Sequence, residues 1–379
     1  MSTSVVLTDD QRMIQESAAA FLDRDSSIER VREWRAQQPG FDRKLWKSLG
    51  ELGWLGLLLP EQYDGMGMGF AELTVLLQEL GTGLLPEPLV AATVLGAGAI
   101  LHGDNDALKA DLLPKTVVGD VVPALAWQEV EGAVDPTAVA TKAEAADGGV
   151  RISGTKTFIP AAGGADGFVV SAQGPEGLAL YWVDKDASGV SLDFQERVDG
   201  GYYGTLTLDN VSVAADARVA SPAVAASVLG RVMDESRIAA SAELLGVMSK
   251  ALEISLDYIR ERVQFGKPIG SFQALQHRSV DLYIQQELSR STVIQGAQVF
   301  DETDDADRRA VAASQAKARC SDGGLRVTRE CIQLHGGIGY TDECNIGLYL
   351  KRAMVLASWL GNGTAHRRRY ADIAPQEEE

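Results

Sequence analysis

Cysteine and histidine are scarce in this chain of 379 residues. Cys320, Cys331 and Cys344 show no Cys-x-x-Cys spacing, so the sequence favours neither a disulfide framework nor a zinc site. The four histidines are scattered and form no His-x-x-x-His pair, the spacing that places two metal ligands on one helix face. We therefore expect buried thiols and no metal in catalysis.

Long apolar runs are missing as well. No segment approaches the roughly 20 apolar residues that cross a bilayer, and the first seven residues have neither the basic stretch nor the apolar core of a secretory signal peptide. Acidic residues outnumber basic ones, 53 to 35, and the net charge of −18 repels nucleic-acid phosphates and anionic lipids. We expect a cytoplasmic protein that binds neither nucleic acid nor membranes.

Helical patterns dominate residues 8–115. Thr8 followed by Gln11 is a capping-box pattern, and the apolar residues after it recur at helical spacing. Further helices are predicted to begin near Asp42 and Ala71. The first part of the chain is thus expected to be a helical domain.

Short β-type runs separated by turn residues occupy residues 121–220. The clearest runs are Val150–Lys156, Gly167–Ala172, Leu178–Val183 and Gly204–Val213. Aspartate, asparagine and glycine between the runs supply turn chemistry. We predict a small antiparallel β domain in this part of the chain.

Long amphipathic helices are predicted again after Pro222. One apolar stripe is expected from Leu245, Met248, Leu252 and Ile259, and a second from Leu275, Leu282, Leu288 and Val299. The order helical, β, helical restricts the fold considerably. We predict three domains: a helical domain at 1–120, a β domain at 121–220 and a helical bundle at 221–379.

Three motifs follow one another along nearly the whole chain. The first is LGELGWLGLLLPE at residues 49–61, followed by a glycine-rich loop at 65–69. The second is RVQFGKPIGSFQ at residues 262–273, and the third is QLHGGIGY at residues 333–340. In this order the motifs resemble the acyl-CoA dehydrogenase family, and the second and third are specific to it.

This resemblance implies a mainly α fold with a β middle domain: an N-terminal helical domain, an antiparallel β domain and a C-terminal four-helix bundle, assembled as a tetramer that binds FAD. It implies α,β-desaturation of an acyl-CoA thioester, with electron-transferring flavoprotein as the electron acceptor. The chain has no Gly-x-Gly-x-x-Gly after a predicted strand, so a Rossmann-type site is not supported. In the family, FAD lies between subunits, and the second and third motifs of a neighbouring chain hold its diphosphate and adenine.

The second and third motifs contain residue types that suit this role. The arginine offers a guanidinium fork for a pyrophosphate, the two glutamines offer neutral amide contacts, and the glycines allow a cofactor to approach the backbone closely. The two phenylalanines can pack on its apolar rim. The predicted FAD-binding residues are Arg262, Phe265, Phe272, Gln273, Gln333, Gly336 and Gly337. The alternative for Arg262 is an exposed cation at a helix C-terminus, where the helix dipole favours it.

The family's catalytic base is absent from its usual place. In the family a carboxylate in a dry site removes the α proton while the β hydrogen leaves as hydride. The usual base lies in a Glu-Gly-Thr segment, which here reads Asn362-Gly363-Thr364, and an amide cannot take the proton. In some relatives the base precedes an arginine, where this chain has Ser236 before Arg237. The nearest candidate base is Glu235, with Asp234 second, although both also suit an acidic helix N-terminus.

The middle domain departs from the family pattern too. Where relatives place a Trp-x-Thr segment against the flavin ring, this chain has Thr157-Phe158-Ile159-Pro160, and Pro160 offers neither a hydroxyl nor an amide hydrogen. The usual Thr-Glu-Pro-Gly loop reads QEVEG at residues 128–132. The chain thus resembles the small, non-catalytic subunits of bacterial heterotetrameric acyl-CoA dehydrogenases that act on bulky or unusual acyl-CoAs such as steroid side chains.

Three functional hypotheses stay open. The first is an obligate subunit of an α2β2 enzyme, in which a partner acyl-CoA dehydrogenase subunit supplies the base and the flavin cradle. The second is a self-sufficient homotetramer with a displaced base such as Glu235. The third is a redox-inactive scaffold that binds acyl-CoA or partner helices. The sequence does not identify the acyl group.

Overall fold

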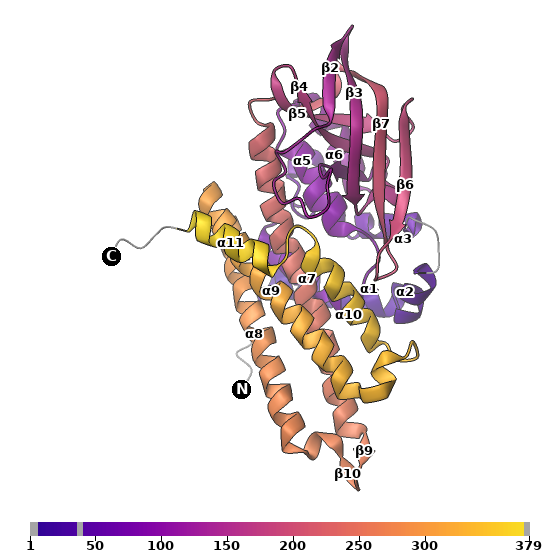
Figure 1. The fold of residues 1–379 in the computed structure, drawn as a ribbon, viewed down its shortest axis with the longest axis vertical. Coiled ribbons are helices and arrows are strands. Elements are labelled where there is room, and N and C mark those ends of the chain that lie inside the picture. The colour runs from indigo at the N-terminus through magenta and orange to yellow at the C-terminus, as the bar shows by residue number, and fades with distance from the viewer. Residues whose placement is uncertain (1–6, 36–40, 375–379) are drawn as a thin grey trace, which may run out of the picture. The chain divides into compact units, whose positions relative to one another are not determined.

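The chain divides into two compact units in the computed structural model, which describes residues 7–35 and 41–374 (Figure 1). One unit, here called the helical unit, comprises residues 1–33, 69–85 and 237–379. The other, the sheet unit, comprises residues 34–68 and 86–236. The predicted boundaries of three domains stay a prediction, because these compact units follow a different division of the chain.

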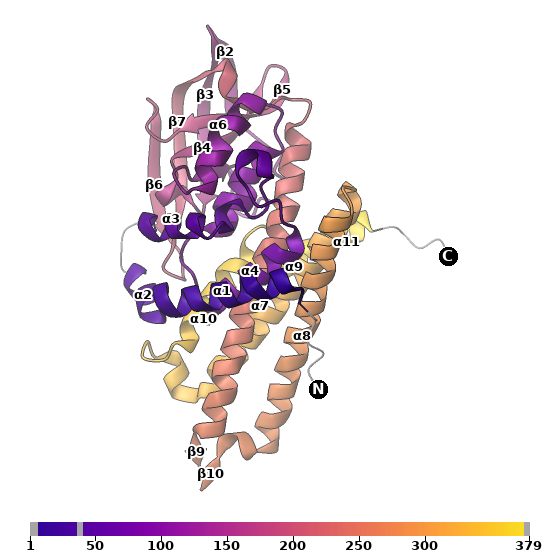
Figure 2. The ribbon, with the colours of Figure 1, turned by 180° about the vertical axis from the view of Figure 1, so that it is seen from behind.

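The helical unit is built from helices of both ends of the chain. They are α1 (Asp9–Asp25), α2 (Ile28–Trp34), α4 (Phe70–Thr82), the second part of α7 (Ala225–Glu261), α8 (Gln273–Glu302), α9 (Ala306–His335), α10 (Ile346–Ser358) and α11 (Gly363–Ile373). Thr8 and Gln11 form the predicted capping box of α1. The helix α4 contacts both α1 and α8, and Figure 2 shows α1 beside α4.

The two predicted apolar stripes had different outcomes. Leu245, Met248, Leu252 and Ile259 are all buried, which confirms the first stripe. In α8, Leu282 is 1% exposed but Leu288 is 48% exposed, so the second stripe was predicted wrongly. Six residues turn an α-helix by about 600°, which leaves Leu288 roughly 120° away from the face of Leu282.

The sheet unit contains one sheet of eight strands. They are β1 (Pro123–Ala126), β2 (Lys142–Ala146), β3 (Gly149–Ile159), β4 (Gly167–Gly174), β5 (Gly177–Asp184), β6 (Val190–Glu196), β7 (Tyr202–Ala214) and β8 (Arg218–Ala220). The strand order is β6-β7-β3-β2-β4-β5-β8, with β1 paired to β4. The four predicted strands correspond to β3, β4, β5 and β7.

The sheet is mixed, whereas the sequence analysis predicted an antiparallel one. Both β1 and β2 pair in parallel with β4, whereas the other pairs are antiparallel. Parallel pairing needs a long connection, and the chain between β1 and β4 supplies one by forming the β2–β3 hairpin. The prediction missed β1 and β2 because their alanine-rich and lysine-containing sequences have low β propensity.

Short helices complete the sheet unit. They include α3 (Arg43–Glu51), the π-helix η3 (Val90–Ala97), α5 (Gly98–Leu101) and α6 (Asp106–Val117). The helix α3 begins near Asp42 as predicted, and Asp42 is its N-cap, accepting hydrogen bonds from the N–H groups of Lys44 and Leu45. A Cβ added at Gly96 would lie 2.3 Å from the Pro123 carbonyl oxygen, so the small residue lets η3 pack closely on β1. No helix within the described residues is long and apolar enough to cross a membrane.

Candidate functional site

The second motif forms a hairpin between α7 and α8, at one end of the helical unit. Figure 1 labels the two strands of this hairpin β9 and β10. Strands β9 (Val263–Gln264) and β10 (Lys267–Pro268) pair antiparallel and are joined by Phe265 and Gly266. Both turn residues have positive φ, 54° and 78°, the backbone that two-residue hairpin turns require. The side chain of Phe265 is 91% exposed, so the turn presents an aromatic ring to its surroundings.

The base of this hairpin is held by contacts within the motif. Ile269 N–H donates to the Arg262 carbonyl oxygen at 2.8 Å. Lys267 Nζ lies 4.4 Å from the centre of the Phe272 ring, and the Phe265 ring meets Phe272 edge-on at 6.1 Å. Arg262 and Gln273 are exposed at the two ends of the hairpin. The predicted cofactor residues of this motif therefore lie together with their polar groups accessible.

The third motif ends α9 and continues into the 3-10 helix η7 (Gly336–Tyr340). Gly336 has φ of 65°, which favours glycine, and Gln333 is exposed. A Cβ added at Gly336 or Gly337 would meet no atom within 4 Å. Within this chain, therefore, neither glycine is needed for close packing, and the backbone of Gly337 borders open space.

A residue that sequence reasoning missed joins the two motifs. The rings of Tyr258 and His335 stack with centroids 4.5 Å apart. Tyr258 lies one helical turn before Arg262, and His335 lies between Gln333 and Gly336. His335 Nδ1 donates to the Cys331 carbonyl oxygen at 2.8 Å, which orients the imidazole ring. The one signal in the sequence that could have identified Tyr258 is its position four residues before Arg262, which places both on the same face of a helix.

These residues suit one end of an FAD molecule better than the other. An exposed guanidinium, exposed amides, an exposed phenylalanine and open backbone at Gly337 fit a diphosphate and an adenine. At the place where the resemblance puts the flavin ring, residues 157–160 offer one hydroxyl, that of Thr157, which makes no hydrogen bond within the described residues. Phe158 follows it with φ of 55° and meets Tyr203 edge-on at 5.8 Å.

Asn362 stands at the usual base position and serves as the N-cap of α11. Its side-chain Oδ1 accepts a hydrogen bond from the Ala365 N–H at 3.0 Å. Asparagine is among the residues that best satisfy the free N–H groups of a first helical turn. The amide therefore has a structural role in this chain and cannot act as a base.

A buried lysine supports the chain just before Asn362. Lys317 Nζ donates to three backbone carbonyl oxygens, those of Leu356 at 2.9 Å, Ala357 at 3.2 Å and Gly361 at 2.9 Å. Two of these carbonyls end α10, where the helix dipole favours a cation. Burial nevertheless lowers the pKa of Lys317 to about 7. The lysine thus fixes the C-terminus of α10 to α9.

Two further groups converge on the same turn. Arg237 Nε and His366 Nε2 both donate to the Leu360 carbonyl oxygen, at 3.3 Å and 2.9 Å. Burial, with the nearby charges of Arg237 and Lys317, lowers the pKa of His366 to about 3, so the imidazole is neutral at pH 7. The segment that leads to Asn362 is therefore held from α7, α9 and α11.

Glu235, the candidate base, is already engaged by two partners in the sheet unit. Its Oε1 accepts from Arg231 Nε at 2.9 Å, and His102 Nε2 lies 3.1 Å from both carboxylate oxygens. The side chain is buried. Proton abstraction by Glu235 would require these contacts to be broken. Glu235 as a base stays a prediction, and this geometry counts against it.

A buried ion pair that was not predicted lies beneath the altered 128–132 loop. Lys156 Nζ is 2.7 Å from Glu129 Oε1 and also donates to Ser171 Oγ at 2.9 Å. Glu129 accepts three more hydrogen bonds, from the N–H groups of Ala140 and Thr141 and from the Thr141 hydroxyl. Burial alone would raise the pKa of Glu129, but Lys156 and these hydrogen bonds lower it to about 2.

Replacing Glu129 by glutamine is expected to destabilise the protein by about 3 kcal/mol at pH 7, because Lys156 is left buried without its counter-ion. The pKa of Glu129 is lower in the folded protein than its ordinary value of 4.5, so the carboxylate stabilises the folded state at pH values above 4.5. This stabilisation is lost as the pH falls towards 2. Urea unfolding followed by circular dichroism from pH 7 to pH 3 measures both effects. The exposed Glu131→Gln change is the matched control, and equal effects of the two would contradict the assignment.

Comparison with known proteins agrees with the predicted family. Residues 8–120 match the family model described as the acyl-CoA dehydrogenase N-terminal domain, and residues 226–374 match the acyl-CoA dehydrogenase C-terminal domain. The chain is 31% identical over 348 residues to the acyl-CoA dehydrogenase FadE27 of Mycobacterium tuberculosis, which covers 90% of each protein. It is 29% identical to the mitochondrial isovaleryl-CoA dehydrogenase of Arabidopsis thaliana, covering 97% of this chain and 91% of the relative.

Solved structures share the fold over almost the whole chain. A variant of the Tcur3481-Tcur3483 steroid ACAD is 35% identical with a TM-score of 0.86, covering 96% of this chain and 97% of its own. The ChsE4-ChsE5 complex from Mycobacterium tuberculosis is 29% identical with a TM-score of 0.88, covering 97% of each chain. These similarities confirm the predicted fold class. The chain belongs to the acyl-CoA dehydrogenase family, whose members are FAD-dependent oxidoreductases.

Proposed function

We propose that this chain is a subunit of a heterotetrameric α2β2 acyl-CoA dehydrogenase and completes the FAD site of its partner subunit. The observation that carries the proposal is a contrast within the helical unit. The residues suited to the diphosphate and adenine are exposed on the hairpin and at the end of α9, whereas the usual base position holds a helix-capping asparagine.

In the proposed site each residue of the two motifs binds or orients the cofactor. Arg262 pairs with the diphosphate, Gln273 and Gln333 donate amide hydrogens, and Gly336 and Gly337 leave their backbone open. Phe265 and Phe272 cover an apolar edge. FAD held by these residues would supply the acceptor for the hydride from the β carbon of the acyl-CoA. This chain's contribution is to hold the cofactor and to exclude water from its far end.

Removal of the proton from the α carbon is assigned to a base of the partner subunit. Asn362 has no proton-accepting group of the required strength, and Glu235 is paired with Arg231 and His102. These two facts favour the heteromeric enzyme over a self-sufficient homotetramer. They also predict that the lone chain lacks desaturase activity.

The proposed substrate is the CoA thioester of a bulky acyl group such as a steroid side chain. The likeness to a steroid ACAD at 35% identity and to the ChsE4-ChsE5 complex supports both the substrate class and the pairing with a second dehydrogenase subunit.

We further assign electron-transferring flavoprotein as the acceptor, the cytoplasm as the location, and domains at residues 1–120, 121–220 and 221–379.

The proposal is tested by the visible absorbance spectrum and the FAD-to-protein ratio of the chain, purified alone and after co-expression with the dehydrogenase encoded by the neighbouring gene. The lone chain is expected to be colourless, and the complex to hold one FAD for every two chains. Full flavin in the lone chain would overturn the proposal in favour of the self-sufficient enzyme. Absence of flavin from every assembly would favour a scaffold without a redox role.

A further inference from the structure

The helices α9 and α11 are basic, although the whole chain has a net charge of −18. Arginine and lysine outnumber acidic residues six to three in α9 and three to one in α11. The two helices pack against each other, as Figure 1 shows. A local excess of positive charge on an acidic protein attracts anions to that region.

A groove of about 350 Å³ lies between α9 and α11. This volume is at the lower end of the range for pockets that bind small molecules. The residues that line it with polar side chains are Ser314, Gln315, Arg319, Asp322, Arg367 and Tyr370. The groove thus combines room for a small ligand with hydrogen-bonding groups from both helices.

Arg319 brings a positive charge to the groove without an acidic partner. One of its terminal nitrogens, Nη2, donates to the Gln285 side-chain oxygen, and its Nε is buried with no hydrogen-bond partner among the described residues. No carboxylate in that part of the chain forms an ion pair with Arg319. A partly buried cation without a counter-ion is costly, so a bound anion would stabilise it.

Arg367 contributes a second guanidinium from α11. Its Nη1 pairs with Asp322, the only acidic residue among the described residues that line the groove. Its Nη2 donates to the Thr364 hydroxyl at 3.3 Å, and its side chain remains 56% exposed. Two arginines against one aspartate leave the groove with a net positive charge.

Close packing of α9 and α11 fixes the walls of the groove. Arg369 Nη1 donates to Ser314 Oγ at 3.0 Å and to the Ala310 carbonyl oxygen at 3.3 Å. A Cβ added at Gly363 would lie 2.4 Å from Asp322 Oδ1, so the first turn of α11 lies directly against α9. Walls that are already in place lower the entropic cost of binding a ligand.

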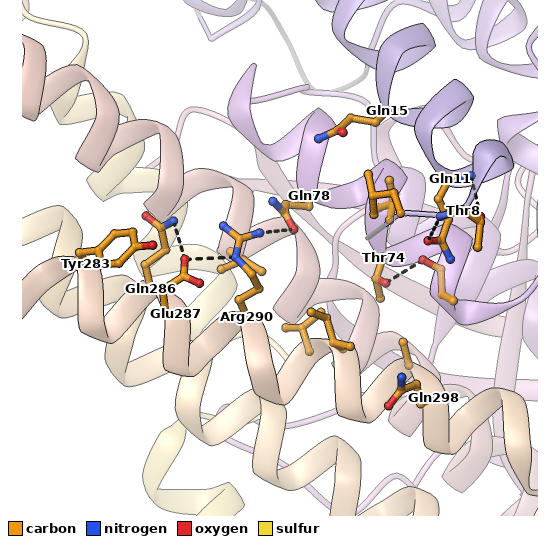
Figure 3. A pocket seen from close by; sticks show the side chains of 17 residues that line it. Thr8, Gln11, Gln15, Thr74, Gln78, Tyr283, Gln286, Glu287, Arg290 and Gln298 are labelled. Atoms are coloured by element: carbon orange, nitrogen blue, oxygen red, sulfur yellow. Dashed lines mark hydrogen bonds and ion pairs between the residues drawn. The ribbon is translucent and has the colours of Figure 1, made fainter. Parts of the chain in front are cut away.

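A second groove of the helical unit shows the opposite arrangement of charge (Figure 3). It lies between α8 and the helices α1 and α4, and its volume is about 650 Å³. Arg290 is the only arginine among the described residues that line it, and Figure 3 shows it joined to Glu287 and Gln78. Arg290 Nε donates to Glu287 Oε1 at 3.2 Å, so its charge is neutralised within the chain.

We propose that the groove between α9 and α11 binds the phosphate group of a small molecule. Guanidinium forks match the oxygens of phosphate, and two of them suit its two negative charges better than the single charge of a carboxylate. Free phosphate and the phosphate ester of a nucleotide share this chemistry. The residues involved lie outside the two motifs assigned to FAD, so the inference does not rest on the proposed function.

Isothermal titration calorimetry of the full chain without FAD, at constant ionic strength, tests the site. The probes are inorganic phosphate and adenosine 3′,5′-bisphosphate, and both are expected to bind the wild-type chain. Arg319→Gln and Arg367→Gln are each expected to weaken binding by about 10-fold, the loss typical of one charge-assisted hydrogen bond. Arg290→Gln removes the same charge from the groove of Figure 3 and should leave the affinity unchanged.

Two results would overturn the proposal: a wild-type chain that binds neither probe, or an Arg319→Gln chain that binds them as tightly as Arg290→Gln does. Tighter binding of the bisphosphate would identify a nucleotide ester as the ligand, and tighter binding of inorganic phosphate would identify the free ion; each supports the site. Circular dichroism of the three variants establishes that they are folded. Because FAD takes no part in the titration, failure here would leave the proposed cofactor site untouched.

Discussion

A Lys317→Met chain is expected to lose about 4 kcal/mol of unfolding free energy, because a buried carbonyl left without a donor costs roughly 1–3 kcal/mol and the carbonyls of Leu356 and Gly361 lose the lysine. The Ala357 carbonyl keeps a donor in the Ser321 hydroxyl. The side chain of Lys317 is completely buried and serves three carbonyl oxygens between Leu356 and Gly361. Methionine retains the apolar stem but donates no hydrogen bond. Urea unfolding at pH 7 measures the loss.

The pH dependence of stability gives this prediction a second readout. The pKa of Lys317 is about 7 in the folded protein, against an ordinary value of 10.5. Between pH 7 and pH 10.5, therefore, Lys317 is protonated in the unfolded chain and largely neutral in the folded chain. The contribution of Lys317 to stability therefore rises with pH from 7 to 10.5, and this rise should vanish in Lys317→Met. Lys250→Met is the control, since its ion pair with Glu253 lies on the surface. Identical pH profiles of wild type and Lys317→Met would contradict the assignment.

In the proposed complex with a partner subunit, an Arg262→Ala change is expected to weaken FAD binding by about 30-fold. This factor corresponds to the roughly 2 kcal/mol of a charge-assisted hydrogen-bond pair. Fluorescence of the released flavin measures the dissociation. Arg262→Lys keeps the charge but loses the planar fork, so an intermediate effect is expected.

Arg260 provides the matched control for this experiment. It lies two residues earlier on α7, is exposed, and pairs with Asp257 at 2.9 Å. Arg260→Ala should leave FAD binding unchanged. If Arg262→Ala retains FAD as well as Arg260→Ala does, Arg262 is only a cation at a helix end and has no role in the cofactor site.

Local patterns predicted the parts of the fold that depend on local contacts. The capping box of Thr8 and Gln11, the helix start near Asp42 and the buried stripe beginning at Leu245 are all present. Errors arose where distant segments decide the outcome. The parallel pairing of β1 with β4 joins segments about forty residues apart, and no local pattern specifies that register.

The candidate site divides in the same way. Motif spacing identified Arg262, Gln333 and their neighbours, because each motif is contiguous in the sequence. The residues that support the site are brought together by tertiary structure: Lys156 reaches Glu129 across 27 positions, and Lys317 reaches carbonyls about forty positions away. A lysine in a helical sequence looks like a solvated residue until its neighbours are known.

The turn at Phe265 has a consequence for the chain on its own. A non-glycine residue with positive φ costs roughly 1 kcal/mol or more, and the ring gains little burial in return within the chain. A glycine at this position would remove the backbone strain and also the exposed aromatic ring. If the proposed partner subunit covers this ring, the chain without its partner should be less stable and should aggregate more readily. The amount of this chain in the cell should then follow the amount of its partner.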